Sequence, residues 1–144
     1  MRLVVDASVV VPCFVPERFS AAARGWIVAA DVLLAPELLS LECANALWKK
    51  ARLGELTLHD ARSALERIVS GFFELRPSTA LACTALELGA KLNHPIYDCV
   101  YVALAEAESA AFVTADRKLV DLVLTNRPSL RAHWVGQEIP KILH

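Results

Sequence analysis

The sequence predicts an α/β fold, a three-layer α/β/α sandwich around a parallel sheet. Short apolar runs of strand length alternate along the chain with longer amphipathic segments. The short runs are apolar at successive positions, which is typical of strands covered on both faces. Strands that alternate with helices favour parallel pairing through right-handed crossovers. We expect one domain over residues 1–144, because no repeat, low-complexity tract or linker interrupts this pattern.

Five segments are predicted strands, each a short apolar run bounded by a charge, a proline or a glycine. They are RLVVD (2–6), DVLLA (31–35), FFELRP (72–77), AAFVTAD (110–116) and RAHWVG (131–136).

The first predicted helices follow recognisable start signals. Ser20 precedes an Ala-rich amphipathic segment. Another helix opens at Pro36 and Glu37 and runs to about Arg52, with Gly54 as its stop.

The later helices also carry start signals. Thr57 with Asp60 three residues on resembles a capping box, and Ser78 is expected to cap the stretch that runs to Leu92. A further helix begins near Asp98, after Pro95 has closed that stretch.

Composition limits the function classes. The hydrophobic fraction is 56% and the mean hydropathy +0.42, which indicates either a membrane segment or an extensive protein interface. Polar residues and prolines interrupt every apolar run, and Asp6 ends the first one too early for a signal peptide. We therefore expect a cytoplasmic protein, not associated with a membrane, whose apolar surface is covered by a partner.

Charge and cysteine content exclude further classes. The net charge of −1 argues against a general polyanion binder, so contacts with nucleic acid require local clusters of Lys and Arg. The four cysteines form no CxxC pair, so neither a zinc site nor a redox motif is indicated. We expect them to be small buried apolar residues in a reducing compartment.

Four acids stand out against their surroundings. Asp6 ends the first predicted strand and Asp116 follows the fourth, so both should project from the edge of the sheet where ligands of α/β folds bind. Glu42 lies inside a mostly apolar helix, and Asp98 begins a helix that is apolar nearly all round. A buried acid is costly unless it is paired, hydrogen-bonded or bound to a cation.

Three of the four acids also have a purely structural interpretation. Asp6 and Asp116 could be N-caps, and Asp98 could be a helix N-terminal charge favoured by the macrodipole. Glu42 has no such explanation, because it lies in mid-helix. Two like charges about 4 Å apart repel by roughly 4 kcal/mol at an effective dielectric constant of about 20. A hard divalent cation such as Mg²⁺ or Mn²⁺ removes this conflict and serves phosphoryl chemistry.

Four segments together resemble the PIN-domain nucleases, and most closely the VapC-type toxins of bacterial and archaeal toxin–antitoxin pairs. The segments are LVVDAS, LECANALWK with Glu42, HPIYDCVYVALAE with Asp98, and FVTADRKL with Asp116. The resemblance implies a five-stranded parallel sheet of order 3-2-1-4-5, with Asp6 and Asp116 on adjacent strands. It also implies Mg²⁺- or Mn²⁺-dependent endoribonuclease activity and an antitoxin partner.

The resemblance assigns roles to the acids. Asp6, Asp98 and Asp116 would hold the metal directly or through water, and Glu42 would complete the shell or orient the attacking water. In-line attack on phosphorus would leave a 5′-phosphate and a 3′-hydroxyl. Ser8 and Thr114 each lie two residues from a site acid, so their hydroxyls are candidate donors to it.

Substrate contacts and partners follow from charge and hydropathy. Positive charge beside an acidic site steers phosphates inward, and the candidates are Lys49, Lys50, Arg52, Arg117 and Lys118.

None of the four histidines is given a catalytic role, because they are dispersed along the chain. Trp26, Trp48 and the apolar face around Leu38, Leu39 and Leu47 are expected to be mostly core. Part of that surface is a candidate antitoxin groove or homodimer interface.

Three alternatives remain open at this stage. A phospho-receiver module needs paired acids after its first strand and a Lys after its fifth, and the sequence supplies neither. A haloacid-dehalogenase-type phosphatase needs a second Asp where this chain has Ser8. A catalytically silent PIN-like binding scaffold is disfavoured by the complete set of acids.

Overall fold

The computed structural model describes residues 1–71 and 73–141 and contains one five-stranded parallel sheet. Its strands are β1 (Arg2–Val5), β2 (Val32–Pro36), β3 (Glu74–Arg76), β4 (Ala111–Thr114) and β5 (Ala132–Trp134). Their order is β3-β2-β1-β4-β5, which confirms the predicted topology. All five predicted strands are present, although residue 72 of the predicted third run lies outside the described residues.

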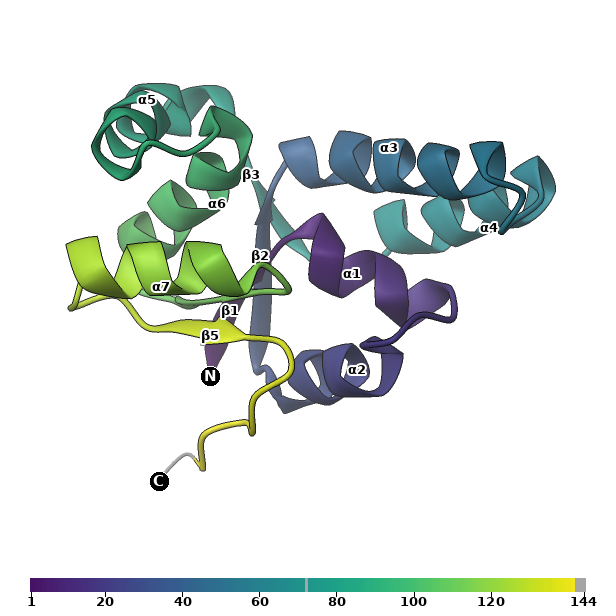
Figure 1. Cartoon of the computed structure of the whole chain (residues 1–144), viewed down its shortest axis with the longest axis horizontal. Coiled ribbons are helices and arrows are strands. Elements are labelled where there is room, and N and C mark those ends of the chain that lie inside the picture. The colour runs from purple at the N-terminus through teal and green to yellow at the C-terminus, as the bar shows by residue number, and fades with distance from the viewer. Residues whose placement is uncertain (72, 142–144) are drawn as a thin grey trace.

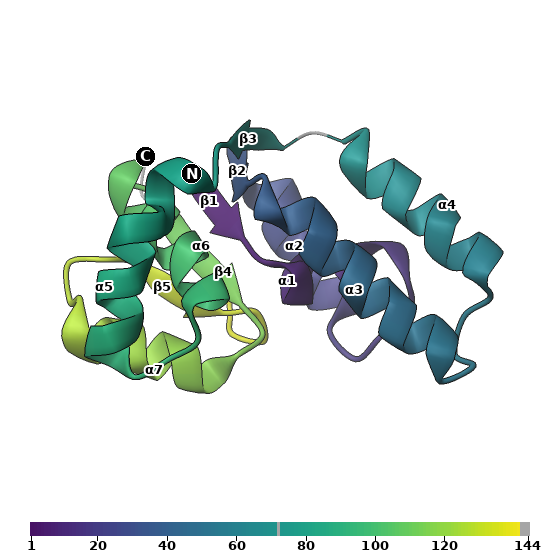
Figure 2. The same ribbon diagram turned by 90° about the horizontal axis from the view of Figure 1, so that it is seen from above.

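Helices flank the sheet on both sides. They are α1 (Ala7–Phe14), α2 (Ser20–Ala29), α3 (Leu38–Arg52), α4 (Leu58–Val69), α5 (Ala82–Leu92), α6 (Ile96–Ala107) and α7 (Arg117–Asn126), with a 3₁₀ turn at Thr79–Leu81. Figures 1 and 2 show α5, α6 and α7 on one side of the molecule and α1 to α4 on the other, with β1 and β2 between them. The pair α3 and α4 extends away from the sheet.

The core explains why the strand runs are continuously apolar. Leu3, Val4 and Val5 of β1 are fully buried, because β2 and β4 pair with its two edges while helices cover its faces. Helix α6 is buried from Cys99 to Ala105 and packs against β1, β2 and β4, as its uniformly apolar sequence predicted. Among the described residues no helix combines the length and apolar character needed to cross a bilayer.

Helix starts agree with the sequence except at one serine. Thr57 caps α4 by accepting a hydrogen bond from the backbone N–H of Asp60 at 3.0 Å, as predicted. The prediction that Ser78 caps the stretch to Leu92 is wrong, because its hydroxyl accepts from the backbone N–H of Leu38 at 3.0 Å. Pairing of β2 with β3 brings Ser78 to the start of α3. The side chain of Glu37, the N-cap residue of α3, makes no capping hydrogen bond there, and Ser78 accepts from the Leu38 N–H.

Two burial predictions also need correction. Trp48 is 53% exposed, because the buried stripe of α3 runs through Leu39, Cys43 and Leu47, and the next position turns away from it. Cys43 and Cys99 are buried as expected, but Cys83 is exposed on α5.

Candidate active site

Asp6 is held by hydrogen bonds from two strand ends. It follows β1, caps α1 and is 8% exposed. Its Oδ1 accepts from the backbone N–H of Ser8 at 3.1 Å and from the Ser8 hydroxyl, and its Oδ2 accepts from the Thr114 hydroxyl at 2.6 Å. Both carboxylate oxygens therefore have protein donors, which fixes the orientation of the group.

The same two hydroxyls tie the end of β4 to Asp6. The Ser8 Oγ accepts from the backbone N–H of Ala115 at 2.9 Å, and the Thr114 Oγ1 accepts from that of Asp116 at 3.1 Å. This contact exists because β1 and β4 are parallel neighbours whose carboxyl ends meet at one edge. Ser8 and Thr114 thus lie where the sequence placed them, as donors to an acid of the site.

Asp116 lies on the exposed rim of this edge. Its Oδ1 accepts from the backbone N–H of Leu119 at 3.1 Å, so it is the N-cap of α7, the structural role that the sequence allowed. The cap uses one carboxylate oxygen. The Asp116 carboxylate also lies close to the side chains of His94 and Asp98.

His94 joins Asp98 and Asp116 in a group that could hold a metal ion. One ligand atom from each of the three lies within 4.8 Å of the others, and the Nε2 of His94 is 2.7 Å from the Oδ2 of Asp98. The sequence predicted no catalytic role for His94, and only the structure shows that it lies beside these two acids. The signal that was missed is its spacing of four residues before Asp98, across the Pro95 turn.

Local backbone geometry places His94 there. Asn93 ends α5 in the left-handed conformation with φ of 50°, which Asn tolerates better than most residues. The backbone N–H of His94 then bonds back to the carbonyl of Gly89 at 3.1 Å. The chain reverses into α6, so that His94 faces the first turn of the helix that carries Asp98.

Glu42 completes the acidic group from the opposite wall. It is half-buried on α3. Burial raises the pKa of its carboxyl and the charge of Asp98 raises it further, while the Tyr101 hydroxyl lowers it. The structure thus brings all four predicted acids to one site, from β1, α3, α6 and the end of β4.

Burial dominates the electrostatics of the site. It raises the pKa of Asp6 from 3.8 to about 6, against the lowering effect of the hydrogen bonds from Ser8 and Thr114. The charges of Asp98 and Glu42 raise this pKa further. Without a cation, the site therefore opposes ionisation of the Asp6 and Glu42 carboxyls.

Tyr101 has a buried hydroxyl beneath the site. Its side chain is fully buried on α6, and this hydroxyl has no hydrogen-bond partner of ordinary geometry among the described residues. Burial raises the pKa of Tyr101, and the nearby Glu42 carboxylate raises it further.

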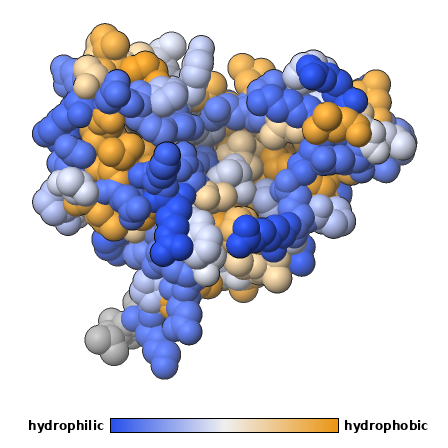
Figure 3. All heavy atoms as spheres, in the orientation of Figure 1, coloured by the Kyte–Doolittle hydropathy of each residue, from blue (hydrophilic) through white to orange (hydrophobic). Residues whose placement is uncertain are grey.

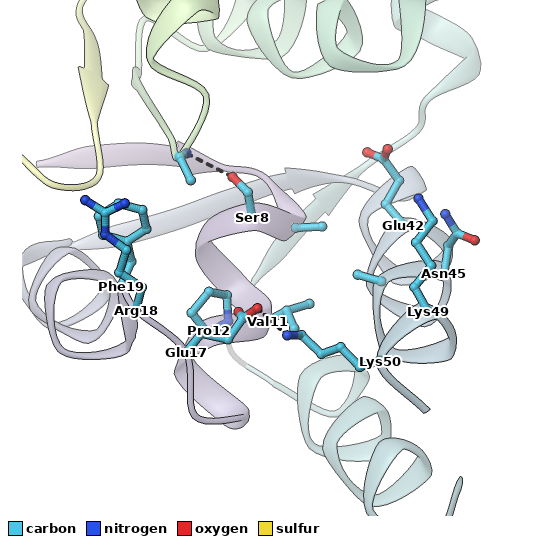
Figure 4. Close-up of a pocket in the computed structure, with 13 residues that line it drawn as sticks. Ser8, Val11, Pro12, Glu17, Arg18, Phe19, Glu42, Asn45, Lys49 and Lys50 are labelled. Atoms are coloured by element: carbon cyan, nitrogen blue, oxygen red, sulfur yellow. Dashed lines mark hydrogen bonds and ion pairs between the residues drawn. The ribbon is translucent and has the colours of Figure 1, made fainter. Parts of the chain in front are cut away.

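A groove of about 440 Å³ leads away from the acids. In Figure 4, Ser8 of α1 and Arg18 and Phe19 before α2 form one wall, and Glu42 and Lys49 of α3 form the other. In Figure 3 strongly hydrophilic groups stand beside the hollow between the two helical groups. Of the four predicted acids, Glu42 lines this groove, and Arg18, Lys49 and Lys50 supply its positive charges.

The predicted substrate cations do not all face this groove. Lys49 and Lys50 line it, but Lys50 forms ion pairs with Glu17 and Glu55. Arg52 packs over the Trp48 ring at 5.3 Å and borders a separate hollow. Lys118 borders another hollow on α7, and Arg117 lies over the Trp134 ring at 4.9 Å.

The donor set fits a divalent cation. Carboxylate oxygens are the ligands that Mg²⁺ and Mn²⁺ prefer, and an imidazole nitrogen is acceptable to Mn²⁺. Burial, and to a smaller extent the neighbouring carboxylates, raises the pKa values of Asp6 and Glu42, and a cation would favour their charged forms. His94, Asp98 and Asp116 already have ligand atoms at mutually compatible distances.

Comparison with known sequences identifies relatives of the chain. A family model described as PIN domain matches residues 3–123. Ribonuclease VapC3 of Pyrobaculum aerophilum is 37% identical over 123 residues, which cover 84% of this chain and 94% of that protein.

Solved structures share the fold. PAE2754 from Pyrobaculum aerophilum superposes with a TM-score of 0.68 at 26% identity, covering 92% of this chain and 83% of that one. A toxin–antitoxin complex from Klebsiella pneumoniae contains a chain that superposes with a TM-score of 0.63 at 14% identity, covering 95% and 99%. At that low identity the second likeness concerns the fold alone.

Proposed function

We propose that this chain, which belongs to the PIN domain family and is related to the VapC ribonucleases, is an RNA-cleaving toxin. The observation that carries the proposal is the convergence of Asp6, Glu42, Asp98 and Asp116 on one sheet edge, beside a groove with cationic side chains. A relative with near-complete coverage is named a ribonuclease, which supports RNA as the substrate.

The proposed site holds Mg²⁺ or Mn²⁺. Asp6, Asp98 and Asp116 would hold the ion directly or through water, with His94 available as a nitrogen ligand. When bound, the ion neutralises charge on the scissile phosphate and lowers the pKa of water, which supplies the nucleophile.

The chain's own residues position the reaction. Ser8 and Thr114 keep the Asp6 carboxylate in one orientation through their hydroxyl groups. Glu42 points from α3 into the groove and lies close enough to Asp98 for that charge to raise its pKa, so its carboxylate could accept a hydrogen bond from the attacking water. Of the cations predicted to contact substrate, Lys50 forms ion pairs with Glu17 and Glu55, whereas Lys49 lines the groove and has no carboxylate at ion-pair distance among the described residues. Arg52 and Arg117 each lie over a tryptophan ring, and Arg117 directly follows Asp116.

Partners and organisation extend the proposal. A structural neighbour is described as a toxin–antitoxin complex, which supports an antitoxin protein as partner. The exposed apolar side chains of α3 and α4, among them Leu41, Trp48 and Leu58, offer surface for an antitoxin or a second copy. We also propose that residues 1–144 form one domain, that the protein is a homodimer and that it is cytoplasmic.

Cleavage of RNA in the presence and absence of a chelator tests the function. Wild-type protein should cleave RNA with Mg²⁺ or Mn²⁺ and lose activity on chelation, and Asp98→Asn should be inactive in both metals. Asp121→Asn is the matched control, because it changes an exposed acid on α7 outside the site. Absence of cleavage by folded protein in any metal, or full activity of Asp98→Asn, would contradict the proposal. RNA binding without cleavage would favour the silent scaffold instead.

A further inference from the structure

Two arginines and two aromatic rings form a continuous row beside the acidic site. The guanidinium of Arg18 lies over the Phe19 ring, 4.9 Å from its centroid. Phe19 meets Trp134 edge to face, with 5.6 Å between centroids and an interplanar angle of 84°. Arg117 lies over the Trp134 ring at 4.9 Å. The row therefore joins the segment before α2, the end of β5 and the start of α7.

Both ends of the row border parts of the site already described. Arg18 and Phe19 line the groove together with Ser8 and Ala115. Arg117 directly follows Asp116, one of the three residues with ligand atoms close together. A strand of RNA whose phosphate reached the acids would pass this row on its way along the groove.

The two guanidinium charges are not neutralised within the described part of the chain. Neither Arg18 nor Arg117 has a carboxylate at ion-pair distance there, and both residues are exposed. By contrast, Arg76 and Arg127 each bond a glutamate at 2.7 Å. The exposed pair is therefore free for an anionic ligand.

The aromatic rings prepare these arginines for planar ligands. Each guanidinium lies over the face of an aromatic ring, and this contact restricts a side chain that would otherwise lose rotamer entropy on binding. The other face of the guanidinium stays open to a nucleobase, and its N–H edge can bond phosphate oxygens. Unpaired bases stack on such planes, whereas the bases of a duplex are already stacked.

We propose that Arg18 and Arg117, backed by Phe19 and Trp134, form a binding row for single-stranded RNA next to the acidic site. This inference rests on the proposed function and names how the substrate is held. The row contributes to binding through its planar cations, so substitution by lysine, which keeps the charge and removes the plane, impairs it.

Binding of a labelled single-stranded RNA tests the row. The assay uses fluorescence anisotropy with Mg²⁺ in an Asp98→Asn background, so that cleavage does not consume the probe. Arg18→Lys combined with Arg117→Lys should weaken binding by about tenfold or more, the scale of one or two lost stacking contacts. Arg67→Lys is the matched control, because Arg67 also lies over an aromatic ring, that of Phe14 at 5.4 Å, and neither residue lines the groove, so RNA binding should be unchanged.

Tryptophan fluorescence supplies a second readout. RNA should quench the emission of Trp134, so the quenching should disappear in Trp134→Phe and persist in Trp48→Phe. Unchanged affinity of the double lysine variant, in a protein whose wild type binds and cleaves RNA, would overturn the row and leave the proposed function intact. If folded wild type neither binds nor cleaves RNA, the proposed function itself fails.

Discussion

The inner and outer ends of the acidic site are built differently. At the inner end, Asp6 is buried and receives hydrogen bonds on both carboxylate oxygens. At the outer end, Asp98 is half-buried and Asp116 exposed, and their contacts are one imidazole and one helix N–H. The inner acid is thus locked in place by the fold, whereas the outer acids remain accessible to a ligand.

The two ends therefore suit different tasks: the inner end fixes the position of a carboxylate, and the outer end can bind and release a metal ion. Burial raises the pKa of Asp6, and its hydrogen bonds hold the carboxylate in one position. The outer acids give up less hydration and are therefore better suited to bind and release an ion. Changes at the outer end should act on metal affinity, and changes at the inner end on stability as well.

The largest effect is expected at Asp98. Asp98→Ala should lower the affinity for Mn²⁺ by about 100-fold or more, at least the loss seen when residues behind a metal ligand are changed. Stability without metal should hardly change, because this side chain is partly exposed and bonds only His94 among the described residues. Calorimetric titration with Mn²⁺ measures the first quantity and thermal unfolding in chelator the second. Asp121→Ala is the control, and a large loss of metal-free stability would break the comparison.

At the inner end, the titration of Asp6 should make the free energy of unfolding depend on pH. The folded-state pKa of Asp6 is about 6 against 3.8 unfolded, so folding favours the protonated form. Its contribution is most favourable below about pH 4 and is lost as the pH rises through about 6, on the order of 3 kcal/mol in the absence of metal.

Asp6→Asn should remove that part of the pH dependence. Chemical unfolding of wild type and variant in chelator, at about pH 5 and about pH 7.5, measures the difference. The advantage of the variant should grow toward the higher pH. An advantage independent of pH would show that Asp6 titrates normally.

Thr114 should couple stability to metal binding. Thr114→Val removes the donor to Asp6 and the acceptor of the Asp116 N–H, which should cost about 1–2 kcal/mol of stability. It should also lower Mn²⁺ affinity by about tenfold. Thr125→Val, on the exposed face of α7, controls for the substitution itself. Loss of stability with unchanged metal affinity would mean that Asp6 does not need this bond to hold its position.

His94 should tune which metal is preferred. His94→Gln should lower Mn²⁺ affinity by about tenfold and Mg²⁺ affinity by less, because imidazole suits transition metals better than Mg²⁺. Calorimetric titrations of both ions give the ratio of affinities. Equal losses for the two ions would instead indicate that His94 only positions Asp98.

The smallest effect is expected at Tyr101. Tyr101→Phe should change the free energy of unfolding by less than about 1 kcal/mol, because its hydroxyl loses no regular hydrogen bond among the described residues. Denaturant unfolding at neutral pH measures the change. Destabilisation beyond that value would reveal a partner for the hydroxyl, such as an ordered water or Glu42 in a tighter contact.

The fold was largely predictable, because hydrophobic periodicity is local information. Continuous apolar runs identified all five strands, and the confirmed strand order came with the family resemblance. Ser78 was misassigned because its hydroxyl bonds Leu38, 40 residues away in sequence. Trp48 was placed in the core because the exact rotation of α3 depends on the elements that pack against it.

The acids of the site were found one by one, whereas their neighbours were not. Asp6, Asp98 and Asp116 lie next to recognisable strand or helix ends, and Glu42 interrupts an apolar stretch. His94 was missed because its role depends on a left-handed turn at Asn93 and on the distance to Asp116. The assignment of catalytic roles to these residues remains a prediction.

The sequence by itself determined the order of the elements, the chemistry of the acids and the family, because each resides in short runs of residues. Only the tertiary structure decided how the acidic site divides into a locked inner end and an accessible outer end. It also decided which cations are free, by pairing Lys50 with Glu17 and leaving Arg18 and Arg117 without a carboxylate partner in the described chain. These properties depend on contacts between segments far apart in sequence, and the packing of the chain alone creates them.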